Sequence, residues 1–219
     1  PKGLELTVEA ESGLESLRSG FLKFEESVQA MRAGQSSKAL TIAAPRDISA
    51  RWLAPQLAAI AVADAELRFT LIAADAPLDF TEANLDLALR WMEGAPDLES
   101  LALDDGRMVP IGPPSGDGPF RLIWSAEDAA VAGDERPIMR VSDAGLALDS
   151  VMNGLGVAIV PLLLAWTDIA AGRVRQLGDG HIGPARYWLV APTPQWRQHK
   201  VRALVAALNE QSPNVDLIE

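Results

Sequence analysis

Charged and aromatic side chains follow the predicted strands of this chain at the points where those strands end. Arginine can pair with a ligand carboxylate, and aspartate can accept hydrogen bonds from a ligand amine. Open α/β sheets bind ligands beyond the carboxyl ends of their parallel strands, so this shared placement predicts a binding site. The side chains concerned are Arg46, Asp47 and Ser49 after one strand, Asp75 after the next, Arg90 and Trp91 at the end of a third, and Ser142 and Asp143 before a helix.

Each of these residues also has a purely structural interpretation. Ser142 or Asp143 is a typical N-cap, and Arg90 could pair with Asp86 or Glu93 on the surface. The residues after the first strand open a helix, whose free backbone N–H groups favour an anion. No residue alone indicates a site, but their common position at strand ends favours one.

The sequence lacks the residues that metal binding, nucleotide binding and catalysis would need. The chain has no cysteine and only two histidines, His181 and His199, which are too few for most zinc or iron sites. No glycine-rich phosphate loop, nucleophile elbow or HExxH motif occurs. Gly154 and Gly156 lie between a predicted helix and a strand, the reverse of the order that a nucleotide loop needs. We therefore predict that the chain is not an enzyme and has no catalytic residue, metal site or cofactor.

Composition limits the partners. A chain of 219 residues that is 48% hydrophobic can bury one good-sized core or two small ones. There is no long apolar run and no pattern of a secretion signal, so we expect a soluble, cytoplasmic protein with no membrane partner. The formal net charge of −11 repels phosphate, so we expect this chain alone to bind DNA poorly.

Residues 7–33 are predicted to form one long helix without proline. Thr7 can cap its first turn, and Gly34 can end it. Apolar residues recur at alternating steps of three and four, which is the spacing of a coiled-coil seam. These residues are Leu14, Leu17, Phe21, Phe24, Val28 and Met31. The seam could pack on its own domain, but so narrow a stripe favours a partner helix and hence dimerisation.

After Lys38 short strands alternate with helices, the pattern of α/β layers. In the first half we predict strands at 39–44, 67–73 and 85–91, a helix at 48–63, and a hairpin or bent strand at 101–111 around Asp105 and Gly106. Residues 112–119 are rich in proline and glycine and form the candidate domain boundary. In the second half we predict strands at 120–124, 138–141, 156–160 and 185–191, and helices at 143–153, 161–171 and 195–211.

Several stretches resemble the glycine-cleavage-activator-like branch of the LysR-type transcriptional regulators. They are LTIAAPRDISARWLAPQL at residues 40–57, LDLALRW at 85–91 and VSDAGLALDSVMNGLGVAIVPLL at 141–163. Residues 187–192 and the last helix extend the likeness. PKGLELT at residues 1–7 resembles the last wing strand of the family's winged helix-turn-helix, while the recognition helix is absent.

The resemblance implies two Rossmann-like subdomains, as in type 2 periplasmic-binding-protein folds, preceded by a long dimerisation helix. Residues 1–6 would be the remnant of the wing and residues 7–36 the linker helix. Subdomain I would comprise residues 38–111 and 191–213, and subdomain II residues 112–190, with crossings near 110–112 and 190–192. An effector would bind in the cleft between the subdomains.

Family effector positions map onto the strand-end residues found above and onto one further turn. They are Arg46, Asp47, Ile48, Ser49, Asp75, Arg90, Trp91, Asp143, Ile159, Val160 and Pro161. One departure from the family pattern concerns residues 113–140, which replace a longer insert. We therefore expect a shortened subdomain II in which Trp124 fills part of the cleft and so joins the candidate site.

The resemblance implies an effector-sensing and oligomerisation module that binds a small anionic or zwitterionic metabolite. Arg46 or Arg90 would pair with its carboxylate, and Asp75 or Asp143 with any amine. The module would form a homodimer or homotetramer and reach DNA only through the missing winged-helix domain. The alternative is a ligand-free assembly module with a vestigial cleft. A free-standing solute-binding protein shares the fold, but the seam helix and the absent export signal count against it.

Overall fold

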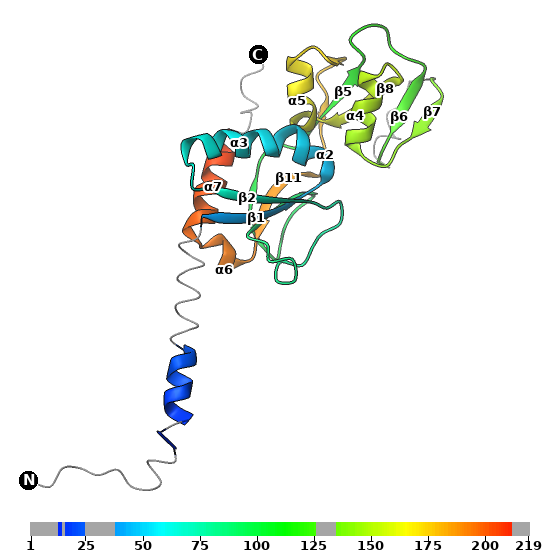
Figure 1. Cartoon of the computed structure of the whole chain (residues 1–219). Coiled ribbons are helices and arrows are strands. Elements are labelled where there is room, and N and C mark those ends of the chain that lie inside the picture. The colour runs from blue at the N-terminus through cyan, green and yellow to red at the C-terminus, as the bar shows by residue number, and fades with distance from the viewer. Residues whose placement is uncertain (1–12, 15, 25–37, 126–134, 212–219) are drawn as a thin grey trace, which may run out of the picture. The chain divides into compact units, whose positions relative to one another are not determined.

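The computed structural model divides the chain into two units, residues 1–38 and 39–219. It describes residues 13, 14, 16–24, 38–125 and 135–211 (Figure 1). In the described part of the chain, no helix has both the length and the apolar character needed to cross a lipid bilayer.

In the first unit, residues 13, 14 and 16–24 are helical, within the helix predicted at 7–33. Four residues of the predicted seam belong to this segment, and their side chains are exposed: Leu14 by 40%, Leu17 by 61%, Phe21 by 64% and Phe24 by 66%. The predicted helix ends at Thr7 and Ala33, and the seam residues Val28 and Met31, lie outside the described residues.

The second unit begins with a mixed sheet whose order is β2-β1-β3-β11-β4. Its strands are β1 (Ala39–Ala44), β2 (Arg68–Ala73), β3 (Leu87–Met92), β4 (Glu99–Ala102) and β11 (Arg186–Ala191). β1 runs parallel to β2 and β3, while β11 lies antiparallel between β3 and β4. The three parallel strands therefore end at one edge, as the sequence predicts for residues 39–44, 67–73 and 85–91.

The helices beside this sheet differ in detail from those predicted. The helix predicted at 48–63 consists of α2 (Arg46–Ile48), a π-helical turn η1 (Ser49–Leu53) and α3 (Ala54–Ala63). The single helix predicted at 195–211 is interrupted, because Gln198 has extended backbone angles between α6 (Thr193–Trp196) and α7 (His199–Glu210). The amphipathic face predicted for this region is confirmed, since α7 buries Val201, Leu204, Val205 and Leu208.

The second sheet has the order β10-β5-β8-β6-β7, and β9 pairs with β5. Its strands are β5 (Arg107–Gly112), β6 (Phe120–Ile123), β7 (Ile138–Arg140), β8 (Gly156–Pro161), β9 (Arg175–Gln176) and β10 (His181–Ile182). Figure 1 shows α4 (Ala144–Met152) and α5 (Leu162–Ala170) beside it. Asp143 caps α4 by accepting a hydrogen bond from the Leu146 backbone N–H at 2.7 Å, which confirms the N-cap interpretation. We call the first sheet with its helices lobe I and the second with its helices lobe II.

Of the two alternatives predicted for residues 101–111, a hairpin or a bent strand, the hairpin is wrong. β4 and β5 do not pair with each other, because β4 pairs with β11 of lobe I and β5 pairs with β8 of lobe II. The chain thus crosses between the lobes at residues 103–106, where Gly106 has φ +80° and donates its N–H to the Asp104 carboxylate at 2.9 Å.

The return crossing lies at residues 183–185, between β10 and β11, and the Gly183 N–H donates to the Gly106 carbonyl at 2.9 Å. Both crossings therefore precede the predicted ones at 110–112 and 190–192, which fall inside or directly after the strands β5 and β11. Residues 112–119, the predicted boundary, connect β5 to β6 within lobe II.

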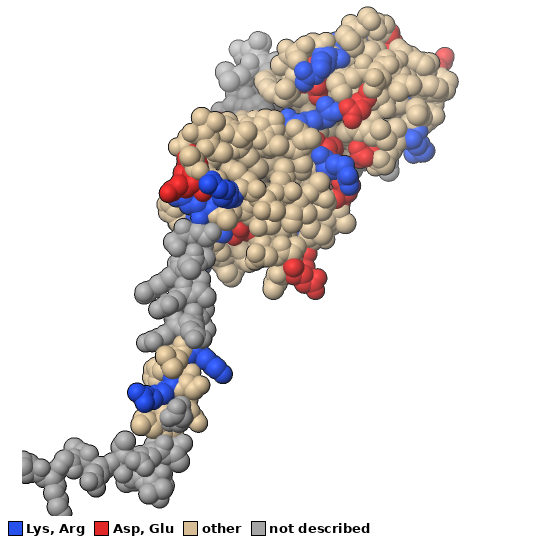
Figure 2. Space-filling view, in the orientation of Figure 1, with Lys and Arg blue, Asp and Glu red and all other residues tan. Residues whose placement is uncertain are grey.

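The lobes also meet through α2 and α4. A Cβ on Gly145 of α4 would collide with the Asp47 Cβ of lobe I, so only glycine lets the two helices approach this closely. Nearby, the Arg51 guanidinium of η1 pairs with Asp149 of α4 and, at 2.8 Å, with Asp168 of α5. The Asp168 side chain is 2% exposed and also accepts from Arg173 at 2.6 Å. Acidic and basic side chains gather along this junction in Figure 2.

We predict that Gly145→Ala destabilises the second unit. The added methyl group must displace Asp47 or push α4 away from α2, and overpacking of this kind costs about 1–3 kcal/mol. Urea denaturation followed by circular dichroism measures the loss. Gly94→Ala is the matched control, because a Cβ there meets no atom within 4 Å. An unchanged free energy of unfolding in Gly145→Ala would contradict the close approach.

A second prediction concerns Asp104 at the first crossing. Burial raises its pKa from 3.8 to about 6. Hydrogen bonds from the backbone amides of Gly106 and Tyr187 oppose this rise. Repulsion from Asp105 adds to the rise, and attraction by Arg186 opposes it. The folded protein therefore keeps this proton at pH values where the unfolded chain has lost it. Stability must fall as pH rises between the two pKa values.

Asparagine cannot ionise, so Asp104→Asn lacks this pH-dependent penalty. Between about pH 4.5 and about pH 7.5, we expect the unfolding free energy of the wild type, minus that of the variant, to fall by roughly 2 kcal/mol. Urea titrations across this range measure both proteins. Parallel pH profiles would show that Asp104 titrates normally in the folded state.

Candidate functional site

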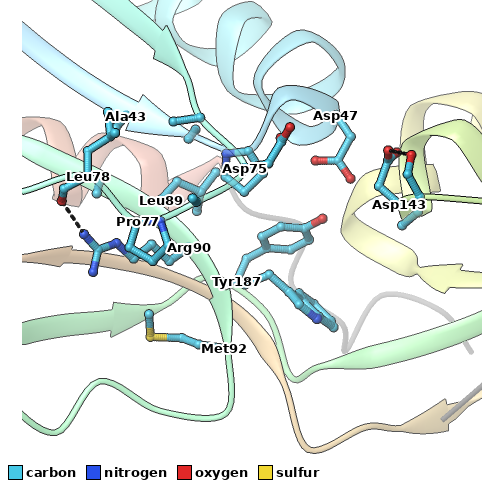
Figure 3. Close-up of a pocket in the computed structure, with 18 of the residues that line it drawn as sticks. Ala43, Asp47, Asp75, Pro77, Leu78, Leu89, Arg90, Met92, Asp143 and Tyr187 are labelled. Carbon is cyan, nitrogen blue, oxygen red and sulfur yellow. Dashed lines mark hydrogen bonds between the residues drawn. The ribbon is translucent and has the colours of Figure 1, made fainter. Parts of the chain in front are cut away.

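A cavity of about 410 Å³ lies between the two lobes. Lobe I supplies residues at the carboxyl ends of β1, β2 and β3, together with Tyr187 of β11, while lobe II supplies Trp124 and residues 142–144. Figure 3 shows these side chains converging on one space. The cavity therefore occupies the edge where the parallel strands of lobe I end, the position at which open α/β sheets bind ligands.

Three carboxylates lie together in this cavity. Asp47 accepts from the Ile48 backbone N–H at 2.7 Å, and Asp75 accepts from the Arg46 backbone N–H at 3.1 Å. Asp143 accepts from the Ser142 hydroxyl at 2.6 Å, in addition to capping α4. Burial raises the pKa of Asp47, and repulsion from Asp143 and then Asp75 raises it further, although its backbone hydrogen bond opposes the change.

Arg90 lines another part of the cavity and is held by lobe I alone. Its guanidinium donates to the Leu78 carbonyl at 3.0 Å and lies 5.4 Å from the centre of the Phe80 ring. The surface pairings with Asp86 or Glu93 suggested by the sequence are not made, and Asp86 pairs instead with Lys200 at 2.7 Å. Burial lowers the pKa of Arg90, but the side chain stays a cation at neutral pH.

An aromatic wall joins the two lobes. The Trp91 and Trp124 rings meet edge to face with centroids 6.5 Å apart, and Trp91 packs against Tyr187 with centroids 4.7 Å apart. The Trp124 indole N–H donates to the Ile159 carbonyl at 2.7 Å, which fixes its ring. Such walls offer apolar surface to a ligand at little cost in side-chain freedom.

Tyr187 is the main lining residue that the sequence interpretation missed. Its side chain is 2% exposed, and its hydroxyl has no hydrogen-bond partner in the described part of the chain. Burial, with repulsion from nearby carboxylates including Asp47 and Asp143, raises its pKa well above 10, so the hydroxyl stays protonated. Its position as the sole tyrosine, in the middle of a predicted strand, was the available signal.

The structure brings half of the predicted effector positions to the cavity. Those lining it are Asp47, Asp75, Arg90, Trp91, Trp124 and Asp143, while Ser142, Pro77, Leu78 and Met92 line it in addition. The predicted positions that do not line it are Arg46, Ile48, Ser49, Ile159, Val160 and Pro161.

Physical reasons account for these six exclusions. The Arg46 side chain is 77% exposed and lies 4.0 Å from Asp75, outside the cavity. Ile48 and Ser49 are buried, and the Ser49 hydroxyl donates back to the Pro45 carbonyl at 2.7 Å. Residues 159–161 belong to β8, and Ile159 contributes only the carbonyl that orients Trp124.

The groups that line this cavity are suited to recognising a ligand. Its lining residues in the described part of the chain include no histidine, cysteine or lysine. Within the same described ranges, no cluster of three or more histidine, cysteine or acidic residues is arranged to hold a metal ion. Charged groups and aromatic rings facing a common space can instead bind a small molecule.

Comparison with known proteins agrees with this description. Residues 111–213 match the family model of the LysR substrate binding domain. The AhcY transcriptional activator HvrB of Rhodobacter capsulatus is 28% identical over 215 residues, covering 87% of this chain and 73% of HvrB. The transcriptional activator AmpR of Pseudomonas aeruginosa is 25% identical over 210 residues, covering 86% of this chain and 71% of AmpR.

Solved structures share the fold. The effector domain of AmpR from Pseudomonas aeruginosa superposes with a TM-score of 0.64 at 19% identity, covering 80% of this chain and 94% of that domain. The LysR-type regulator CrgA from Neisseria meningitidis gives 0.63 at 17% identity, covering 98% of this chain and 82% of CrgA. The predicted α/β architecture of the periplasmic-binding-protein type is thus confirmed, while the glycine-cleavage-activator-like branch stays a prediction.

The relatives are transcriptional regulators and not enzymes. The chain is thus similar to LysR-type transcriptional regulators: residues 111–213 match the LysR substrate binding domain, and the fold is that of the AmpR effector domain.

Proposed function

We propose that the cavity between the lobes is an effector site through which a small metabolite controls transcription. The observation that carries the proposal is the convergence of Asp47, Arg90, Tyr187 and Trp124, from both lobes, on one space of about 410 Å³. A space of this size accommodates a small metabolite, and its polar groups are few and directed inward. The match of residues 111–213 to the LysR substrate binding domain supports the same role.

A ligand in this cavity acts by favouring one arrangement of the lobes over another. It switches the protein only if its affinity differs between the two arrangements. The contacts that such a change would alter include the approach of Gly145 to Asp47 and the pairing of Arg51 with Asp168. The resulting change in assembly would alter the spacing of attached DNA-binding domains.

The seam helix supports oligomerisation as a second function. Leu17, Phe21 and Phe24 are each more than 60% exposed, and large apolar side chains repeated along one helix usually pack on a partner. We propose that this helix forms a homodimer, which could assemble further into a homotetramer. A ligand-free assembly module is the competing function, and it requires the same helix but no occupant in the cavity.

Filling the cavity tests the effector function. We predict that Ala76→Trp abolishes ligand binding, because Ala76 lines the cavity and has an exposed side chain that can be enlarged without rebuilding the core. A ligand at about 100 times its dissociation constant adds roughly 2.7 kcal/mol of stability, which raises the melting temperature by on the order of 5–10 °C. A melting screen of amino acids, dicarboxylates, aromatic acids and cell-wall fragments measures this shift.

Ala65→Trp is the matched control, since Ala65 is exposed in a turn and does not line the cavity. We expect the stabilising compound to shift the control and the wild type equally and to leave Ala76→Trp unchanged. If no compound shifts the wild type, or if Ala76→Trp keeps the full shift, the assembly function becomes the better account.

Interrupting the seam tests oligomerisation separately. We predict that Phe21→Glu converts a dimer into monomers at micromolar concentration, because a carboxylate in an apolar helix interface is buried without a partner. Sedimentation velocity measures the assembly. The control Arg18→Glu changes a polar side chain of the same helical segment. Unchanged sedimentation of Phe21→Glu would remove this helix from the interface.

A further inference from the structure

The charges that line the cavity are distributed unevenly (Figure 3). In the view of Figure 3, Asp47 and Asp143 lie on the same side of the Tyr187 hydroxyl, and Asp75 projects toward the same end. Arg90 lies apart from them, beside Pro77 and Leu78. The cavity therefore has an acidic end with three carboxylates and a separate basic position with one guanidinium.

No basic side chain in the described ranges forms an ion pair with Asp47 or Asp143. Both accept hydrogen bonds from neighbouring N–H or O–H groups, but each carboxylate has more acceptor positions than these bonds occupy. Arg46 offers Asp75 little compensation, since the closest approach of the two side chains is 4.0 Å and both are largely exposed. The negative charge at the acidic end is thus left for a ligand to balance.

The Tyr187 hydroxyl points into the same space. Although its side chain is 98% buried, this hydroxyl has no partner in the part of the chain that the structure describes. A tyrosine hydroxyl is both a hydrogen-bond donor and an acceptor, and in a largely buried tyrosine it usually finds a partner. The Tyr187 hydroxyl is not among the fully buried unpaired atoms, so it is open to the cavity, where a ligand atom can bond to it beside the carboxylates.

Resting on the effector function proposed above, we propose that the ligand carries a protonated amine, which binds between Asp47 and Asp143 and against the Tyr187 hydroxyl. An ammonium group has three N–H donors and no acceptor, and the two carboxylates and the hydroxyl oxygen supply three acceptors. Trp91 and Trp124 contact the apolar part of the ligand. A ligand carboxylate, where there is one, lies toward Arg90.

Two other ligand classes fit these residues less well. A purely anionic ligand would meet three carboxylates and one guanidinium, which already donates to Leu78 and packs on Phe80. A metal ion needs several ligands at once, and no group of three suitable side chains within the described residues is arranged to hold one. Of the anionic and zwitterionic metabolites predicted from the sequence, the cavity thus favours those that bear an amine.

The test uses the whole chain and probes that differ mainly in charge. Isothermal titration calorimetry compares phenethylamine and tryptamine with phenylpropionate, an anion of similar size and shape to phenethylamine, and with magnesium chloride. We expect the amines to bind and the anion and metal not to bind. Asp47→Asn and Asp143→Asn should each weaken amine binding by about tenfold to a hundredfold, the effect of losing a charge-assisted hydrogen bond.

The asparagine in Asp143→Asn can still cap α4, so this variant tests charge with little loss of structure. The matched control is Asp79→Asn, which makes the same change of charge at an exposed turn residue outside the cavity and should bind amines as the wild type does. Tyr187→Phe should weaken binding by several fold and keep the ring contact with Trp91.

The results separate this inference from the effector function. If phenylpropionate binds and the amines do not, or if Asp47→Asn and Asp143→Asn bind amines unchanged, the ligand class is overturned. Should that anion binding be lost in Ala76→Trp, the cavity remains an effector site with a different ligand. If neither amine binds, the proposed amine class of ligand is also overturned. The effector function itself fails only if no compound in the melting screen gives a shift that Ala76→Trp removes.

Discussion

The close approach of α4 to α2 is the constraint on which the geometry of the cavity depends. Gly145 allows it, since any larger residue would meet the Asp47 side chain of the opposite lobe. The same contact brings Asp47 and Asp143, from different lobes, to one end of the cavity. Packing at one glycine thus sets the distance between two carboxylates, and with it the strength of their repulsion.

Arg51 offsets part of the cost of holding the lobes together. Its guanidinium reaches from η1 to two acidic residues of lobe II, of which Asp168 is almost fully buried and also paired with Arg173. A buried carboxylate with two arginine partners is costly to separate, because opening leaves an uncompensated charge. The ion pairs of Arg51 therefore hold the two lobes together, whereas repulsion between the carboxylates in the cavity pushes them apart. A cation bound in the cavity would reduce that repulsion and so favour the closed arrangement of the lobes.

Local patterns in the sequence were sufficient where local forces decide the structure. The strands at 39–44 and 67–73 and the Asp143 cap were predicted because β-branched runs and N-cap chemistry act over a few residues. The turn at Asp105 and Gly106 was correctly located but misassigned, since the same turn chemistry serves a hairpin and a crossing between lobes. β5 belongs to lobe II because it pairs with β8, which is distant in the sequence and so cannot be inferred from the local pattern.

In the candidate site, too, the sequence predicted some positions correctly and others not. Asp75 and Arg90 were predicted because parallel strand ends must share an edge, whereas Arg46 and Ser49, only a few residues away, face other directions. Tyr187 could not be placed from local pattern, because its position follows from the antiparallel insertion of β11 between β3 and β4.

The proposed amine site depends on burial as well as on negative charge. Carboxylates on an open surface are screened by water and salt, so they distinguish weakly between cations. Here burial removes part of the hydration of Asp47 and so raises the pKa of that carboxyl, and the aromatic wall of Trp91, Trp124 and Tyr187 lines the same cavity. A group that restores charge balance in this space must also replace the hydrogen bonds of water, and a protonated amine with apolar substituents does both.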